Sequence, residues 1–180
     1  MTLLSKGYQK INRILPIDFC RHEANQIMSD VVQQQAIGYD YQRGWCWQIY
    51  NPEPMQQMHK EAQPLMEEMV GEKLFPTYSY VTAYTNNSYM APHVDRESCE
   101  ISVSINLASS LDWKLFIRDL HGVEVELSTT EGDGIAYLGT KVRHWRDVLI
   151  SNKPEFYIQT FFHYVRADGK YAHLKNDASQ

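Results

Sequence analysis

Residues 100–107 alternate strictly between polar and apolar side chains, and this pattern restricts what the chain can fold into. Isoleucine, valine or leucine occupies the odd positions of the segment, and glutamate, serine or asparagine the even ones. Because residues i and i+2 of a strand share a face, the segment predicts a strand with one apolar side. Further strand patterns, separated by turn signals, cover 78–84, 113–118, 123–127, 134–138, 142–148 and 156–165. Many short strands with regular turns are typical of a β-sandwich or barrel.

The first part of the chain carries helical patterns instead. Apolar residues recur at helical spacing over 18–35, and again over 52–71, where Gly71 marks the expected end of the second helix. Pro64 lies inside this second pattern, where proline kinks or splits a helix. Between the helices, the aromatic-rich segment 39–50 predicts a strand or hairpin arm, which either covers a substrate or packs against the sheet.

Length and composition favour one globular domain over 1–180, with helical support and an arm over 1–74 and a β-core over 75–166. The net charge of −5 argues against nucleic acid or membrane lipid as the main partner. The chain shows no signal-peptide pattern and no apolar run long enough to span a membrane. Cys20, Cys46 and Cys99 lack metal-motif spacing and are interpreted as free thiols, so we expect a cytoplasmic protein.

The tripeptide His93-Val94-Asp95 is the first candidate for chemistry. The two polar residues, at i and i+2 of a strand end, point to the same side and can bind one metal ion. Two histidines and one carboxylate form the facial triad of non-haem Fe(II) oxygenases, which leaves coordination positions open. An H-x-D tripeptide also arises often by chance, so the interpretation depends on a third ligand.

His144 is the preferred third ligand. In a double-stranded β-helix, a jelly-roll type of fold, about four strands separate the first ligands from the last, which takes roughly 40–50 residues. The 48 residues between Asp95 and His144 fit this separation. His121 follows Asp95 too early and lies in a predicted turn. His163, on the last predicted strand, is the rival candidate.

The stretch from Tyr78 to Val165 resembles the catalytic core of the Fe(II)/2-oxoglutarate-dependent oxygenases, especially the prolyl-4-hydroxylase-like group. The matching pieces, in chain order, are Tyr84 with Asn86-Asn87-Ser88, Pro92-His93-Val94-Asp95, the strand at 101–107, Glu131-Gly132-Asp133-Gly134 and His144. The resemblance implies a mainly β fold, a double-stranded β-helix with N-terminal helices packed on one sheet. It also implies Fe(II) as cofactor and 2-oxoglutarate as co-substrate.

In that family a tyrosine and a basic residue bind the distal (C5) carboxylate of 2-oxoglutarate. Tyr84, nine residues before His93, matches the tyrosine, although a core aromatic would also explain it. Lys153, nine residues after His144, matches the basic residue by spacing. Arg146 competes with it on physical grounds, because it shares strand parity with His144 and its planar guanidinium fits a carboxylate.

The resemblance implies a dioxygenase that converts 2-oxoglutarate and O2 to succinate and CO2 while hydroxylating an unactivated C–H bond. Asp95 favours hydroxylation, since halogenating relatives lack this carboxylate. The substrate is a small molecule or a peptidyl side chain, and the sequence specifies neither it nor the oligomeric state. Two alternatives stay open: a cupin-like metal-binding jelly roll without 2-oxoglutarate chemistry, and an oxygenase acting on alkylated nucleic acid, against which the acidic pI counts.

Several polar residues near the tripeptide have two interpretations each. Ser102, Ser104 and Asn106 either line the co-substrate pocket or face solvent. Arg96 and Glu100 either contact substrate or form a surface ion pair.

Overall fold

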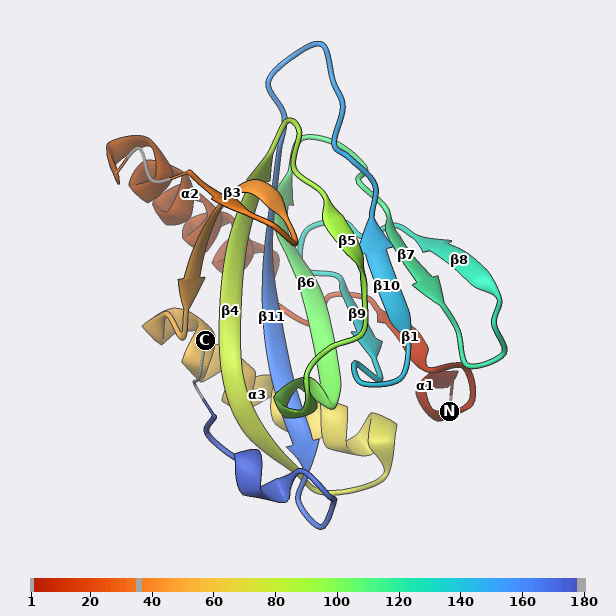
Figure 1. Cartoon of the computed structure of the whole chain (residues 1–180). Coiled ribbons are helices and arrows are strands. Elements are labelled where there is room, and N and C mark those ends of the chain that lie inside the picture. The colour runs from red at the N-terminus through yellow and green to blue at the C-terminus, as the bar shows by residue number, and fades with distance from the viewer. Residues whose placement is uncertain (1, 35–36, 178–180) are drawn as a thin grey trace.

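Two antiparallel sheets face each other in the computed structural model, which describes residues 2–34 and 37–177 (Figure 1). The larger sheet has the strand order β1-β9-β6-β11-β4-β3-β2, and the smaller one β5-β10-β7-β8. The strands are β1 (Tyr8–Ile11), β2 (Gly38–Asp40), β3 (Gly44–Tyr50), β4 (Leu74–Thr85), β5 (Met90–His93), β6 (Ile101–Ser109), β7 (Leu115–Arg118), β8 (Glu124–Leu127), β9 (Gly134–Tyr137), β10 (Arg143–Arg146) and β11 (Phe156–Arg166). This arrangement confirms the predicted jelly roll, as two facing sheets rather than a closed barrel.

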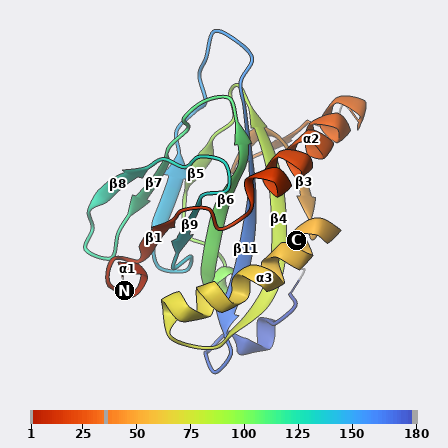
Figure 2. The same cartoon turned by 180° about the vertical axis from the view of Figure 1, so that it is seen from behind.

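Two long helices cover the outer face of the larger sheet, as Figure 2 shows. They are α2 (Ile17–Gln34) and α3 (Glu53–Val70), and both were expected from the periodicity, although Gln35, the predicted last residue of the first, lies outside the described residues. A short helix, α1 (Thr2–Lys6), precedes them, and single 3-10 turns occur at Glu97–Cys99 and Ala172–Leu174. No helix within 2–34 or 37–177 has the length and hydropathy needed to cross a bilayer.

Helix α3 runs unbroken through Pro64. Pro64 is exposed, so its ring and the carbonyl group that it leaves unpaired face water rather than the sheet. The helix ends where Gly71 adopts a left-handed conformation (φ 76°) and its N–H donates to the carbonyl oxygen of Glu67 at 2.7 Å. The predicted end of the helix is therefore confirmed, and the helix is not split at Pro64.

Strand β6 is buried on both faces. Ile101, Val103 and Ile105 are fully buried in the core cluster that includes residues of α2 and α3. The serines and the asparagine that alternate with them are buried too, at 0–4% exposure, and do not face solvent. Because the smaller sheet lies over this polar face, these side chains point into the interior between the sheets, where a polar site can form.

The helix α1 and the strand β1 lay outside the sequence prediction, because four or five residues are too few for a periodic pattern to stand out. The short strand β5 was expected only as the strand end that carries His93 and Asp95, and it ends at His93, so that Asp95 lies beyond it. Strand β1 extends the larger sheet by pairing with β9, and β5 forms the edge of the smaller sheet by pairing with β10. The second of these pairings positions the candidate metal ligands.

His59 is a buried histidine that packs α3 onto the larger sheet. Its ring stacks on Phe162 with centroids 5.0 Å apart, and its Nε2 atom lies 3.0 Å from the backbone carbonyl oxygen of His163. Burial lowers the pKa of His59 to about 3, so the imidazole is neutral in the folded protein at pH 7. His22 on α2, by contrast, is exposed.

The buried His59 makes stability depend on pH in a predictable direction. In the unfolded chain the imidazole titrates at its ordinary pKa, so below about pH 6.5 the unfolded state binds the extra proton. The contribution of the neutral His59 to the free energy of unfolding is therefore fully present above that pH. It falls on acidification, by about 2 kcal/mol between pH 6.5 and pH 5. His59→Gln should reduce this pH-dependent loss by that amount in urea titrations, and His22→Gln should leave it unchanged. An equal pH dependence in wild type and His59→Gln would contradict this assignment.

Candidate metal centre

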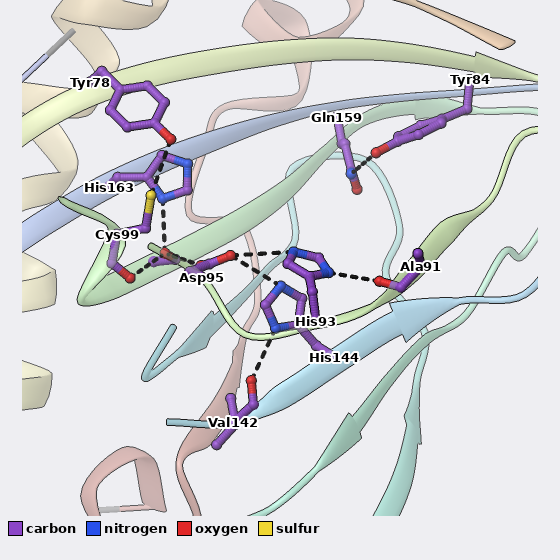
Figure 3. Close-up of polar contacts among 11 residues, drawn as sticks. Tyr78, Tyr84, Ala91, His93, Asp95, Cys99, Val142, His144, Gln159 and His163 are labelled. Atoms are coloured by element: carbon purple, nitrogen blue, oxygen red, sulfur yellow. Dashed lines mark hydrogen bonds and ion pairs between the residues drawn. The ribbon is translucent and has the colours of Figure 1, made fainter. Parts of the chain in front are cut away.

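His93, Asp95 and His144 come together on the inner side of the smaller sheet (Figure 3). His93 is the last residue of β5, and it lies directly opposite His144 of β10 in the strand register. Asp95 follows two residues later, where its backbone N–H donates to the carbonyl oxygen of Gly139 at 2.9 Å. The ligand atoms of the three residues all lie within 4.8 Å of one another.

Hydrogen bonds fix the orientation of both imidazoles. Nδ1–H of His93 donates to the carbonyl oxygen of Ala91 at 2.7 Å, and Nδ1–H of His144 to that of Val142 at 3.1 Å. A carbonyl oxygen can only accept, so each neutral ring presents the lone pair of Nε2. Each Nε2 atom lies 3.4 Å from Oδ1 of Asp95. Such hydrogen bonds from the second ring nitrogen are the usual support of metal-binding histidines.

Asp95 carries a negative charge at the centre of this group. Burial alone would raise the pKa of its carboxyl group, but the charge and hydrogen bonds of His144 and His93, when their rings are protonated, hold the pKa well below its ordinary value. When both rings are neutral, a divalent cation can supply the positive charge that this largely buried carboxylate favours. The donor set of two neutral nitrogens and one oxygen fits Fe(II) and leaves room for further ligands.

The second oxygen of Asp95 is held by another hydrogen-bonded pair. Ser102 Oγ donates to Oδ2 of Asp95 at 3.0 Å, and Nδ1 of His163 lies 2.8 Å from the same hydroxyl oxygen. The hydroxyl hydrogen is shared between Asp95 and the carbonyl oxygen of Cys99, which lies 3.2 Å away, and both can only accept, so Nδ1–H of His163 is the donor in the bond to the serine. Burial lowers the pKa of His163 to about 4, so it too is neutral. His163 therefore lies behind Asp95, on the side away from His93 and His144, while His121 lies exposed in the turn after β7.

Gly139 approaches Asp95 more closely than any residue with a side chain could. A Cβ atom at this position would overlap Oδ2 of Asp95 and the carbonyl oxygen of Cys99. The sequence analysis did not single out Gly139, because its need for glycine comes from the segment of Asp95 and Cys99, which is distant in sequence. A glycine inside a strand-rich segment is the only signal that pointed to a close approach.

Arg146 lies inside the protein at the other end of the site. It is 2% exposed, and its Nη atoms donate to the carbonyl oxygen of Trp113, to the hydroxyl of Tyr157 at 3.2 Å and to Oε1 of Gln159 at 3.1 Å. Its Nε–H is buried without a partner, and no carboxylate of the described residues forms an ion pair with it. A buried guanidinium without a counter-ion is costly, so this end of the site favours an anion.

Tyr84 and Lys153 lie very differently with respect to Arg146. Tyr84 is fully buried, and its hydroxyl accepts from Nε2 of Gln159 at 3.2 Å (Figure 3). It therefore belongs to the same polar group, the Arg146 cluster, which consists of Arg146, Tyr84, Tyr157 and Gln159. Lys153 lies in the loop after β10, with its side chain 75% exposed and paired with Glu155 at 3.4 Å. The structure thus brings Tyr84 and Arg146 together and leaves Lys153 at the surface.

A cavity of about 390 Å³ opens beside the three ligand residues. Its lining includes His93, Asp95 and His144, but none of the residues of the Arg146 cluster. The site therefore has a closed polar end at Arg146 and an open end toward solvent, with the triad at the cavity.

Known structures share this fold, although no family model and no curated protein matches the sequence. A prolyl-4-hydroxylase from Pseudomonas putida is 18% identical and superposes with a TM-score of 0.67 over 90% of this chain and 95% of that one. The 2-oxoglutarate-dependent epimerase SnoN of nogalamycin biosynthesis gives 0.74 at 13% identity, over 92% and 80%. HygX from Streptomyces hygroscopicus, solved with nickel and 2-oxoglutarate bound, gives 0.70 at 9% identity, over 92% and 85%. The fold is thus the one shared by prolyl-4-hydroxylases and other 2-oxoglutarate-dependent enzymes.

Gly139→Ala should impair metal binding without unfolding the protein. The added methyl group pushes Asp95 or the backbone at Cys99 aside, and a misplaced ligand of this kind costs about 10- to 100-fold in metal affinity. Mn(II) binding, followed by the paramagnetic resonance signal of the free ion, measures the change. Gly38→Ala is the matched control, because a Cβ there meets nothing within 4 Å. Wild-type Mn(II) affinity in Gly139→Ala would show that the close approach does not position Asp95.

Proposed function

We propose that the protein is an Fe(II)- and 2-oxoglutarate-dependent dioxygenase that hydroxylates an unactivated C–H bond. The observation that carries the proposal is the combination of two sites along one interior. The carboxylate of Asp95 lies beside the Nε2 atoms of two histidines, and a buried Arg146 without an acidic partner among the described residues lies at the closed end. The fold, shared with enzymes of this chemistry, supports the same conclusion.

His93, Asp95 and His144 would hold the iron. When bound, it supplies the activation of O2, coupled to the conversion of 2-oxoglutarate to succinate and CO2 and to oxidation of the substrate. Ser102 keeps Oδ2 of Asp95 occupied, which leaves Oδ1 directed toward the two histidines. His163 supports the serine and takes no ligand position in this assignment.

Arg146 is the proposed anchor of the distal carboxylate of 2-oxoglutarate. Its planar guanidinium suits a bidentate contact, and Tyr84 with Gln159 adds a hydroxyl and an amide beside it. A cupin-like binding module without 2-oxoglutarate chemistry would have no evident use for a buried arginine that lacks a counter-ion. The buried free thiols Cys20, Cys46 and Cys99 fit the proposed cytoplasmic location.

Hydroxylation is proposed over other outcomes because Asp95 fills the carboxylate position of the triad. The structural neighbours also include an epimerase, so the same fold and co-substrate serve more than one oxidation. Among them, a prolyl hydroxylase was solved with a peptide fragment and HygX with hygromycin B bound, which is consistent with either a peptidyl or a small-molecule substrate.

Alanine substitution of each proposed ligand tests the metal assignment. His93→Ala, Asp95→Ala and His144→Ala should each abolish stoichiometric Fe(II) binding and succinate formation from 2-oxoglutarate, because two remaining donors hold the ion too weakly. His163→Ala should retain one iron per chain. If His144→Ala keeps the iron and His163→Ala loses it, the third ligand is His163.

A titration of 2-oxoglutarate into Mn(II)-loaded variants tests the anchor. Arg146→Ala removes a charge-assisted contact and leaves an anion buried alone, so affinity should fall by roughly 10- to 100-fold or more. Lys153→Ala should change it little, since that side chain faces solvent. Mn(II) affinity should survive in both variants. The reverse order of effects would assign the carboxylate to Lys153.

A further inference from the structure

The cavity beside the triad carries features that the triad and the co-substrate anchor do not use. Two arginines, Arg43 and Arg96, belong to its lining together with a group of aromatic side chains. Because the Arg146 cluster lies outside this lining, the cavity is the space left for the primary substrate. Its volume of about 390 Å³ is at the low end for small-molecule sites, so the substrate is small.

Aromatic rings form one wall of the cavity. They project from the inner face of β3, β4 and β11, where Tyr50 pairs with Tyr80 and Tyr80 with Phe161 in the strand registers. Ring centroids are 4.6 Å apart for Tyr50 and Tyr80, 5.8 Å for Tyr80 and Phe161, and 4.6 Å for Tyr78 and His163. A continuous aromatic surface of this kind favours a flat or unsaturated ligand.

Arg43 is held over this wall by a well-defined turn between β2 and β3. Its backbone N–H donates to Oδ1 of Asp40 at 3.0 Å, and its carbonyl oxygen accepts from the N–H of Tyr89 at 2.9 Å. The guanidinium carbon lies 5.0 Å from the centre of the Tyr80 ring, and the side chain is 20% exposed. Asp40 pairs with it at 3.4 Å. The turn therefore fixes this guanidinium within the cavity lining.

Arg96 approaches from the opposite element, directly after Asp95. Its guanidinium carbon lies 4.8 Å from the centre of the Tyr78 ring, at the exposed rim. Arg43 and Arg96 thus belong to the lining of the same cavity, although 53 positions separate them in the sequence.

The cavity is suited to an anion, because two guanidinium groups belong to its lining. Asp40 pairs with one of them, that of Arg43. A carboxylate carries one negative charge at pH 7, and its two oxygens match a guanidinium fork. A phosphate monoester carries nearly two charges and is larger.

We propose that the primary substrate is a small aromatic or otherwise unsaturated carboxylic acid. Its carboxylate lies at Arg43 and Arg96, and its flat part lies against the wall of aromatic rings. This assignment rests on the proposed function and adds the substrate class to it. Arg43 and Arg96 are then specificity-determining residues, distinct from the Arg146 anchor of the co-substrate.

Two matched probes, an acid and its neutral analogue, test the assignment. The probes are 3-phenylpropanoate and 3-phenylpropanamide, titrated by ligand-observed NMR into protein loaded with Mn(II) and 2-oxoglutarate. The acid should bind and the amide should not. Arg43→Gln and Arg96→Gln should each weaken the acid by about tenfold or more. Arg118→Gln, which alters an exposed arginine of β7 paired with Glu124, should leave it unchanged.

Several outcomes would overturn the assignment. The assignment is wrong if the acid and the amide bind equally, or if the acid does not bind. It is also wrong if both arginine variants keep the wild-type affinity for the acid. If Arg43→Gln fails to fold, Arg43→Lys keeps the charge and loses the planar fork, and it should still weaken binding of the acid.

Affinity for 2-oxoglutarate should stay at the wild-type value in these variants. Loss of that affinity in Arg43→Gln would make Arg43 the co-substrate anchor instead. Failure of wild-type protein to bind Mn(II) or 2-oxoglutarate would instead reject the proposed function.

Discussion

The pairing of β5 with β10 is the constraint on which the site depends. It sets His93 opposite His144, and the chain then turns so that Asp95 lies between their Nε2 atoms. A shift of one residue in this register would move one histidine to the outer face, because side chains alternate along a strand. The backbone carbonyl oxygens that fix both rings come from the same two segments, so the fold determines ligand identity, ring orientation and tautomer together.

The interior between the sheets divides into two chemically different ends. Toward Arg146 the side chains are closed in and polar, with Tyr84 and Gln159 beside the guanidinium. Toward Arg43 the space is open and lined by tyrosines. With the triad at this cavity, a co-substrate and a substrate would meet from opposite sides. This division explains why a protein of modest size keeps several buried polar groups, which stability alone would not favour.

Much of this arrangement could be predicted from the sequence, since it follows from short-range periodicity. The two long helices and the alternation at 101–107 specified the fold, and strand parity placed Arg146 in the interior. What periodicity missed depends on contacts between distant segments. Gly139 shows no local pattern, yet Asp95 packs against it. Arg43 enters the cavity lining only because its hairpin docks beside β5.

The central claim is that one interior binds ferrous iron and 2-oxoglutarate together, and anaerobic absorption spectroscopy tests it most directly. Adding 2-oxoglutarate to the Fe(II)-loaded protein should produce a weak visible charge-transfer band, the sign of a keto acid bound through two oxygens to ferrous iron. The band should be absent in Asp95→Ala and should require more 2-oxoglutarate in Arg146→Ala. Bound iron without any such band, at saturating 2-oxoglutarate, would contradict the account and favour a metal-binding jelly roll with other chemistry.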